Sequence, residues 1–281
     1  DQLPIPKRMR WGAGEAQFVR PVHWIVLLFG ADTLPATLLD TQAGNRTRGH
    51  RFHAPAPITL GTPDDYAGAL ETGGKVIASF AKRREMIRSG VEAKAKEMGG
   101  RAILSEALLE EVTALVEWPV PVAGRFEERF LELPREVLIS TLQDHQRYFA
   151  VEDAAGRLLT AFITVSNIES REPAQVRTGN ERVVRPRLSD AAFFWQQDRR
   201  EPLAARLAGL DAVTFQAKLG SLGAKVKRIE SISETISARL NWNVLQAQRS
   251  AALAKCDLLT AMVGEFPELQ GIMGSYYATA D

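Results

Sequence analysis

Residues 179–200 read GNERVVRPRLSDAAFFWQQDRR and combine closely spaced arginines with three consecutive aromatic side chains, Phe193, Phe194 and Trp195. From residue 171 to residue 200 there are seven arginines against two aspartates and two glutamates, a local balance of +3. The whole chain balances only to +1. Positive charge is therefore concentrated in this stretch and is not spread along the chain.

The proline in this stretch predicts where a helix begins. Pro186 disfavours helical backbone at Arg185, so we expect a helix to start near Ser189, a good N-cap residue, and to carry the aromatic side chains. Arg182, Arg185 and Arg187 would then lie at the entry to that helix, where free backbone N–H groups also attract anions.

Two interpretations of these side chains compete. In one, the aromatics anchor a core and the arginines pair with Glu181, Asp190 and Asp198. In the other, the arginines meet an external polyanion, because arginine suits phosphate and outnumbers the acids here. Large apolar groups usually lie inside, so we expect aromatics facing inward and arginines facing outward.

Length and composition exclude several classes of protein. The 281 residues suffice for two domains, and 45% apolar with 25% charged residues is typical of a soluble globular chain. No apolar run of about 18 residues exists, so we expect no membrane span. The single cysteine, Cys256, and the lack of a signal peptide favour a reducing, cytoplasmic compartment. The near-zero net charge allows a nucleic-acid binder that uses local patches.

Hydrophobic patterns predict an α+β fold with a boundary near residue 168. Residues 1–168 form a mixed domain and residues 169–281 an all-helical one. In the first, we expect a buried strand at 24–29, a hairpin turn at 30–32, helices at 75–98, from 105 and at 135–145, a strand at 120–123, and a hairpin of 148–151 with 158–165. In the second, we expect helices at 203–210, 222–240, 245–263 and 267–278.

A second basic stretch, residues 41–63, contains no acidic residue and holds Arg46, Arg48 and Arg51 with His50 and His53. Its glycines and prolines predict a loop. The stretch is either a solvated loop or a phosphate contact, and Arg48 and Arg51 are the candidates for that contact.

The sequence patterns that could indicate catalysis or metal binding are each incomplete. Residues 220–225 (GSLGAK) are too short for a phosphate-binding loop, and Val226 stands where Ser or Thr would hold magnesium. His50 and His53 lack nearby Cys or acidic partners for zinc. His145 beside Asp144 is either a general base or, more commonly, a capped or surface histidine. We therefore assign no catalytic and no metal-binding residue.

Several motifs occur in a fixed order along the chain. They are 9–12 (MRWG), 18–24 (FVRPVHW), 48–52 (RGHRF), 108–112 (LLEEV), 117–119 (EWP), 180–188 (NERVVRPRL), 255–258 (KCDL), 271–274 (GIMG) and 276–278 (YYA). With these motifs the chain closely resembles the beta subunit of bacterial heterotetrameric glycyl-tRNA synthetase. The resemblance covers essentially the whole chain.

The resemblance implies an alpha2–beta2 enzyme that attaches glycine to tRNA(Gly) with ATP. It implies that the alpha subunit carries the adenylation site, where ATP and magnesium are used, and that the beta subunit, paired with a second beta copy, holds tRNA. It further implies that this chain is an internal fragment whose helical half is HD-like but degenerate, because Cys256 replaces a metal-binding histidine.

Two alternatives stay open. Helical domains with His and His-Asp ligands hydrolyse phosphoesters with a metal, but this chain has no histidine after His145. The other alternative is a non-catalytic scaffold whose arginines pair internally and whose task is to dock the alpha subunit. The leading hypothesis is that Arg182, Arg185 and Arg187, followed by Arg48 and Arg51, contact the phosphates of tRNA.

Overall fold

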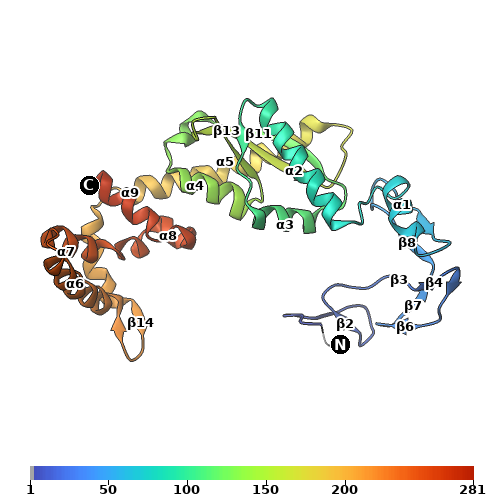
Figure 1. Cartoon of the computed structure of the whole chain (residues 1–281), viewed down its shortest axis with the longest axis horizontal. Helices are drawn as coiled ribbons and strands as arrows, with labels where there is room; N and C mark the ends of the chain where they lie inside the picture. Colours follow the sequence, from blue (N-terminus) through green and yellow to red (C-terminus); the bar gives the residue numbers. More distant parts are fainter. Residues whose placement is uncertain (1–2) are drawn as a thin grey trace. The chain divides into compact units, whose positions relative to one another are not determined.

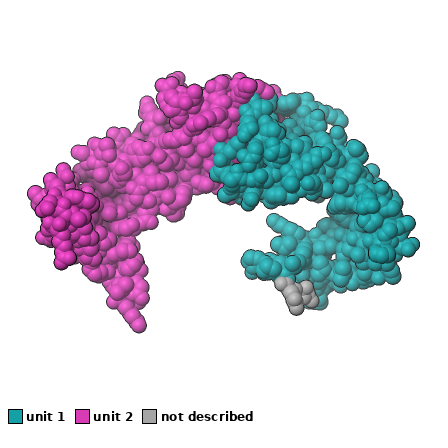
Figure 2. Space-filling model, in the orientation of Figure 1, with its two compact units in different colours: residues 1–94, 104–122, 165–173 teal, residues 95–103, 123–164, 174–281 magenta. Residues whose placement is uncertain are grey.

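The computed structural model describes residues 3–281 and has a mixed α+β fold, as the sequence predicts (Figure 1). The chain divides into two compact units (Figure 2). Unit 1 comprises residues 1–94, 104–122 and 165–173, and unit 2 comprises residues 95–103, 123–164 and 174–281. Each unit is built from several separate segments, whereas the sequence predicts two continuous domains that meet near residue 168. That division therefore stays a prediction.

Unit 1 contains short strands and helices. β3 pairs in parallel with β7, β6 pairs with the other edge of β7, and the remaining strands form two-stranded ladders β1–β2, β4–β5 and β8–β9. The elements are β1 (Met9–Arg10), β2 (Gln17–Phe18), β3 (Ile25–Val26), β4 (Leu28–Phe29), β5 (Asp32–Thr33), β6 (Thr37–Leu38), β7 (Thr41–Gly44), β8 (Arg46–Arg48), β9 (Pro57–Thr59), α1 (Asp65–Thr72), most of α2 (Phe80–Glu97) and α3 (Glu106–Leu115).

Two expectations for unit 1 are wrong. The predicted buried strand at 24–29 is divided between β3 and β4, and Phe29 is 75% exposed. The basic stretch 41–63 is not a plain loop, because β7, β8 and β9 lie in it. In β8 the buried Thr47 alternates with exposed Arg46 and Arg48, the period of two that a strand requires.

Other expectations for this part of the chain are confirmed. Ser105 caps α3, since its hydroxyl accepts a hydrogen bond from the Leu108 N–H at 3.2 Å. Gly99, with φ of +81°, follows the end of α2 in the left-handed conformation that glycine favours. The predicted strand at 120–123 is the start of β11.

Unit 2 contains most of a four-stranded sheet, of order β10-β12-β13-β11, and a series of helices; residues 120–122 of β11 and 165–166 of β13 belong to unit 1. β12 pairs antiparallel with both β10 and β13, which confirms the predicted hairpin. The elements are β10 (Arg101–Ala102), β11 (Val120–Arg125), 3-10 helix η1 (Glu128–Glu132), α4 (Arg135–Ser140), π-helix η2 (Thr141–His145), β12 (Phe149–Glu152), β13 (Leu158–Ser166), α5 (Pro173–Asp198), η3 (Leu203–Ala212), β14 (Thr214–Gln216), β15 (Gly220–Ser221), α6 (Leu222–Arg239), α7 (Val244–Leu253), η4 (Cys256–Leu259), α8 (Ala261–Glu265), η5 (Pro267–Leu269) and α9 (Ile272–Ala280).

α5 is one continuous helix with Pro186 inside it, so the predicted start near Ser189 is wrong. An internal proline costs about 3 kcal/mol, because it removes an N–H and disfavours helix at the preceding residue. Val184, Leu188 and Ala191 on the opposite side are fully buried. Burying a valine or leucine contributes about 1.5–3 kcal/mol each, so core packing outweighs the local preference.

The C-terminal part of the chain is not all-helical, because β14 and β15 form a short antiparallel hairpin that the sequence did not predict. Gly220, with φ of +84°, lies where the chain enters β15. The predicted helix 245–263 is also divided, since α7 ends at Leu253 and Thr260 caps a new helix by accepting from the Val263 N–H at 3.2 Å.

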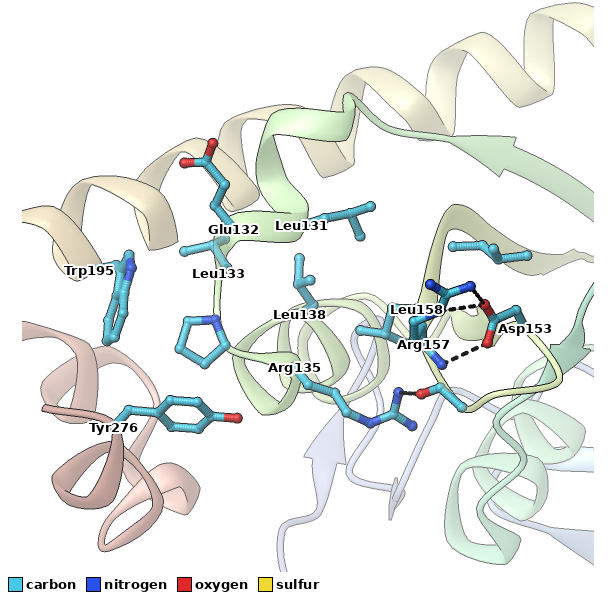
Figure 3. Close-up of a pocket in the computed structure, with 13 residues that line it drawn as sticks. Leu131, Glu132, Leu133, Arg135, Leu138, Asp153, Arg157, Leu158, Trp195 and Tyr276 are labelled. Carbon is cyan, nitrogen blue, oxygen red and sulfur yellow. Dashed lines mark hydrogen bonds and ion pairs between the residues drawn. The ribbon is translucent and has the colours of Figure 1, made fainter. Parts of the chain in front are cut away.

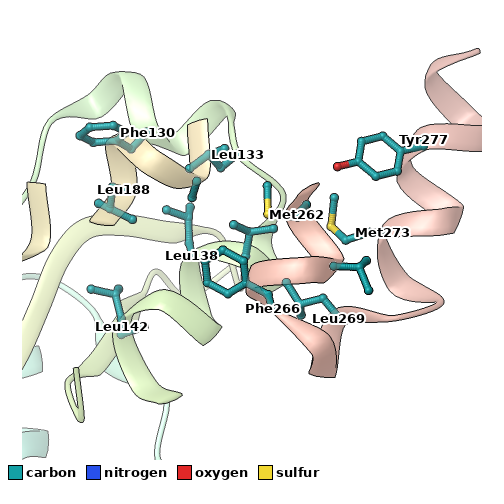
Figure 4. Packing of buried hydrophobic residues seen from close by; sticks show 14 of the residues in the cluster. Phe130, Leu133, Leu138, Leu142, Leu188, Met262, Phe266, Leu269, Met273 and Tyr277 are labelled. Carbon is teal, nitrogen blue, oxygen red and sulfur yellow. The ribbon is translucent and has the colours of Figure 1, made fainter. Parts of the chain in front are cut away.

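One apolar cluster in unit 2 joins the segment 126–162 to α5 and to the helices that follow it. Figure 4 shows Leu138 and Leu188 of this cluster together with Phe266 and Met273 from the last helices. Residues from all of these segments are less than a tenth exposed. The cluster therefore fixes α5 along its buried side.

The carboxylate of Asp198, at the end of α5, is 3% exposed and accepts three hydrogen bonds. Its donors are the N–H of Ala261 at 2.9 Å, the N–H of Met262 at 2.9 Å and the hydroxyl of Tyr277 at 2.9 Å. Arg206 lies 3.7 Å away and balances the charge. Burial of the Tyr277 side chain raises the pKa of its hydroxyl, and the charge of the nearby Asp198 carboxylate raises it further.

Replacing Asp198 by Ala should destabilise the protein by about 3–5 kcal/mol, because it leaves buried donors and a guanidinium unpaired. The urea midpoint measures this change. Asp190→Ala is the matched control, since Asp190 is exposed on the same helix, and it should shift stability by less than about 0.5 kcal/mol. Equal midpoints for the two variants would contradict this role of Asp198.

Glu152 in β12 is buried and bonds two arginines of unit 2. Its carboxylate accepts from Arg135 at 2.5 Å and from Arg101 at 2.6 Å. These bonds, that to Arg135 first, lower the pKa of Glu152. A lowered folded-state pKa contributes stability above the unfolded-state pKa, and this contribution is lost as the pH falls through the folded-state value.

Glu152→Gln should therefore reduce stability at pH 7, and the difference from the parent protein should shrink as the pH falls below the ordinary glutamate pKa of about 4.3. Urea midpoints at several pH values test this. Glu128→Gln, at an exposed position of the same unit, serves as the control. A difference that stays constant with pH would show that the ion pairs do not contribute.

Candidate nucleic-acid interface

Arg182, Arg185 and Arg187 all lie within α5 and are exposed, as expected for arginines that face outward. They do not stand at a helix entry, so the predicted help from free backbone N–H groups does not apply. Arg185 is the only one of the three with an ion pair in residues 3–281: its Nε lies 2.6 Å from Glu127, and its side chain is 60% exposed.

The helix does not bring the three arginines onto one face. At 3.6 residues per turn, Arg182 and Arg185 lie about 60° apart around the helix axis. Arg187 follows Arg185 by two residues and is turned about 160° away from it. Arg182 and Arg185 can therefore contact one stretch of phosphates together, whereas Arg187 points elsewhere.

The three aromatics divide between the two sides of α5. Phe194 and Trp195 pack against the core, and the Trp195 ring stacks on Tyr277 with centroids 5.2 Å apart. Phe193 is 56% exposed, so the expectation that all three face inward is wrong for it. A predicted helix that continued through Pro186 would have placed Phe193 opposite the buried positions, because the helical period is 3.6 residues.

The second pair of candidates lies in unit 1. The Arg48 guanidinium lies over the Trp24 ring, 5.9 Å from its centroid, and Arg51 is exposed in the turn after β8. No pattern in the sequence predicts the contact with Trp24. Cation–π contacts at exposed sites contribute about 0.5–1 kcal/mol, so Trp24 orients Arg48 without neutralising it.

His50 anchors the turn that carries Arg51. It is 4% exposed, and its Nε2 lies 2.6 Å from the carbonyl oxygen of Asn167. Its Nδ1 accepts from the N–H groups of Phe52 and His53, each at 3.2 Å. The contact with a carbonyl makes Nε2 the donor, so both ring nitrogens are engaged in holding the backbone.

The other two histidines that invited a functional reading also have structural contacts. His53 Nε2 accepts from the Glu169 N–H at 2.9 Å, and the ring of His145 stacks on Phe266 with centroids 4.8 Å apart. Among the described residues, no group of three or more His, Cys, Asp or Glu side chains is arranged to hold a metal ion.

The Cys256–Asp257 pair is buried and serves the backbone. Asp257 Oδ2 accepts from the N–H groups of Gly271 at 2.5 Å and Gly274 at 3.1 Å. A Cβ at Gly274 would come within 3.2 Å of this oxygen, so glycine allows the close approach. Burial, followed by the charge of Asp257, raises the pKa of the Cys256 thiol, which keeps it protonated and unreactive.

A cavity of about 730 Å³ in unit 2 is lined by Trp195, Tyr276 and several leucines (Figure 3). Its two arginines are already paired: Arg135 donates to the Gly156 carbonyl at 2.7 Å, and Arg157 bonds Asp153 at 2.8 Å. The lining contains neither histidine nor cysteine. The cavity offers a mainly apolar surface, with Glu132, Asp153 and Tyr276 among its few polar side chains.

Within residues 3–281, no helix is both long enough and apolar enough to cross a membrane.

Comparison with known proteins identifies the family of the chain. A family model described as glycyl-tRNA synthetase beta subunit matches residues 1–281. Glycine–tRNA ligase beta subunits from Marinobacter nauticus and Chromohalobacter salexigens are 54% and 56% identical over 99% of this chain, and that of Pseudomonas aeruginosa is 51% identical. The chain spans about 40% of the length of these relatives. The chain belongs to the glycyl-tRNA synthetase beta subunit family.

Proposed function

We propose that this chain is the tRNA-contacting part of a glycine–tRNA ligase, which attaches glycine to tRNA(Gly) with ATP. The observation that carries the proposal is the exposed pair Arg182 and Arg185 on a helix fixed by the core of unit 2, in a chain of this family. Arginine forms bidentate bonds with phosphate and keeps its charge at every physiological pH.

In this proposal, the adenylation reaction takes place on a separate alpha subunit. ATP and its magnesium would be held there, because the described residues of this chain offer no suitable set of ligands. The glycine-containing segment 220–225 does not form a phosphate cradle, since the Ser221 hydroxyl accepts from the Ala224 N–H at 3.1 Å and caps α6. The role of this chain is to bind and position tRNA.

The assembly would contain the alpha subunit, a second beta subunit and tRNA(Gly), and would act in the cytoplasm as part of protein synthesis. We also propose that residues 169–281 are derived from an HD-like helical domain that has lost its metal site. The buried Cys256–Asp257 pair supports this, because Cys256 bonds the Ala252 carbonyl and Asp257 Oδ2 accepts from two backbone N–H groups. The same observation argues against a phosphohydrolase.

Reconstitution tests the proposed activity. The full-length protein and its purified alpha partner should together attach glycine to tRNA(Gly), whereas neither should do so efficiently alone. The readout is acid-precipitable radioactive glycine on tRNA. Charging by the alpha partner alone at the rate of the mixture would reject the ligase role and favour the docking scaffold.

Arg185→Ala and Arg182→Ala should each weaken tRNA binding by the reconstituted complex. Each lost phosphate contact should flatten the plot of log K against log salt by about 0.9 where the RNA is duplex and about 0.7 where it is single-stranded. Arg157→Ala is the matched control, because this exposed arginine of unit 2 is paired with Asp153. Unchanged slopes with unchanged melting temperatures would remove the two α5 arginines from the contact surface.

The same assay tests the second pair of arginines, Arg48 and Arg51, and the isolated Arg187. If Arg187→Ala flattens the slope as much as Arg185→Ala does, then RNA must contact both sides of α5. We expect a smaller effect for Arg187, because it is turned away from the other two.

A further inference from the structure

The outward side of α5 carries an aromatic ring between polar and basic side chains. Arg182, Arg185, Ser189, Phe193 and Gln196 follow one another at intervals of three or four residues, and all except the half-buried Ser189 are exposed. This spacing places them on one face of the helix. We call this set the α5 outer stripe.

The stripe carries no carboxylate of its own. Glu181 is turned away, and its Oε1 accepts from the Arg125 N–H at 3.0 Å. Glu127 bonds the Nε of Arg185 and leaves the two terminal nitrogens of that guanidinium without a recorded partner in the part of the chain that the structure covers. An exposed ion pair of this kind contributes only about 0–1 kcal/mol, so a phosphate can displace it.

The proposed phosphate contacts do not explain why Phe193, an apolar side chain of the stripe, is exposed. Its side chain is 56% exposed, and its one ring contact in the described residues is an edge-on contact with Phe194 at 5.9 Å. Two residues later, Trp195 points into the cavity on the other side (Figure 3). More than half of Phe193 is therefore open to solvent.

We propose that the α5 outer stripe binds single-stranded RNA, with an unpaired base stacked on Phe193 and the adjoining phosphates held by Arg182 and Arg185. Exposed aromatics beside arginines are the means by which proteins bind unpaired nucleotides. A paired base presents no free face to the ring, so Phe193 discriminates against duplex. The stripe from Arg182 to Phe193 is about 16 Å long, which suits a short unpaired segment.

This inference rests on the proposed function and narrows it. The proposed function requires tRNA contact and does not say which form of RNA meets α5. The stripe assigns that contact to unpaired nucleotides of the tRNA.

The test uses the reconstituted full-length complex with two fluorescein-labelled probes, a 12-nucleotide single-stranded RNA and a blunt duplex of the same length. Phe193→Ala should weaken single-strand binding by about 5- to 100-fold, the range of one lost base stack, and should leave duplex binding unchanged. Phe193→Trp should restore the affinity, and Phe193→Leu should not, because only the former keeps an aromatic face. Fluorescence anisotropy at fixed salt gives all the affinities.

Val183→Ala is the matched control, because Val183 is also an exposed apolar residue of α5 (47%) and lies off the stripe. Single-strand binding that is unchanged in Phe193→Ala, or equally weakened in Val183→Ala, overturns the proposal. So does a Phe193→Ala variant that binds both probes normally but fails to assemble with the alpha partner, because the stripe would then be a protein interface.

Charging of tRNA, measured in parallel, distinguishes a failure of the stacking proposal from a failure of the ligase proposal. If the parent complex charges tRNA normally and Phe193→Ala does not change binding of the single-stranded probe, the stacking inference is overturned and the ligase role stands. Phe193-dependent single-strand binding without any charging supports the stripe and overturns the ligase role.

Discussion

The hydrogen bonds accepted by Asp198 hold together the part of the molecule on which the candidate interface depends. A buried carboxylate is costly unless its bonds are satisfied, and here two backbone N–H groups and the Tyr277 hydroxyl satisfy it. The bonds fix the end of α5 to α8 and α9. Since α5 cannot rotate about its axis without breaking them, the direction of its outward face is also fixed.

The same constraint explains why one helix can carry both core and interface residues. Leu188 and Trp195 pack inward, while Arg185 and Phe193 lie on the opposite side. Holding side chains on a rigid helix lowers the entropy lost on binding. A phosphate contact between exposed groups is weak by itself and screened by salt, so affinity requires several such contacts on a rigid surface.

Much of the fold follows from local sequence, and the main failure, the path of α5, depends on residues that are distant in the sequence. Ser105, Gly99 and the hairpin of β12 with β13 were predictable, because caps, turns and alternating strands depend on neighbouring residues. The path of α5 through Pro186 was not, because burial against segments distant in the sequence decides it. That error hid the helical face on which Phe193 lies, so the sequence placed Arg182, Arg185 and Arg187 together at a helix entry and Phe193 inside.

The buried Cys256–Asp257 pair shows how a carboxylate can serve the backbone of a neighbouring helix. Asp257 Oδ1 is buried and has no hydrogen-bond partner within the described residues, whereas Oδ2 accepts from two glycine N–H groups at the start of α9. Those N–H groups are the ones a helix start leaves unpaired, so the Asp257 carboxylate completes the start of α9. These bonds offset part of the cost of burying the carboxylate, and they tie the segment that carries Cys256 to the last helix.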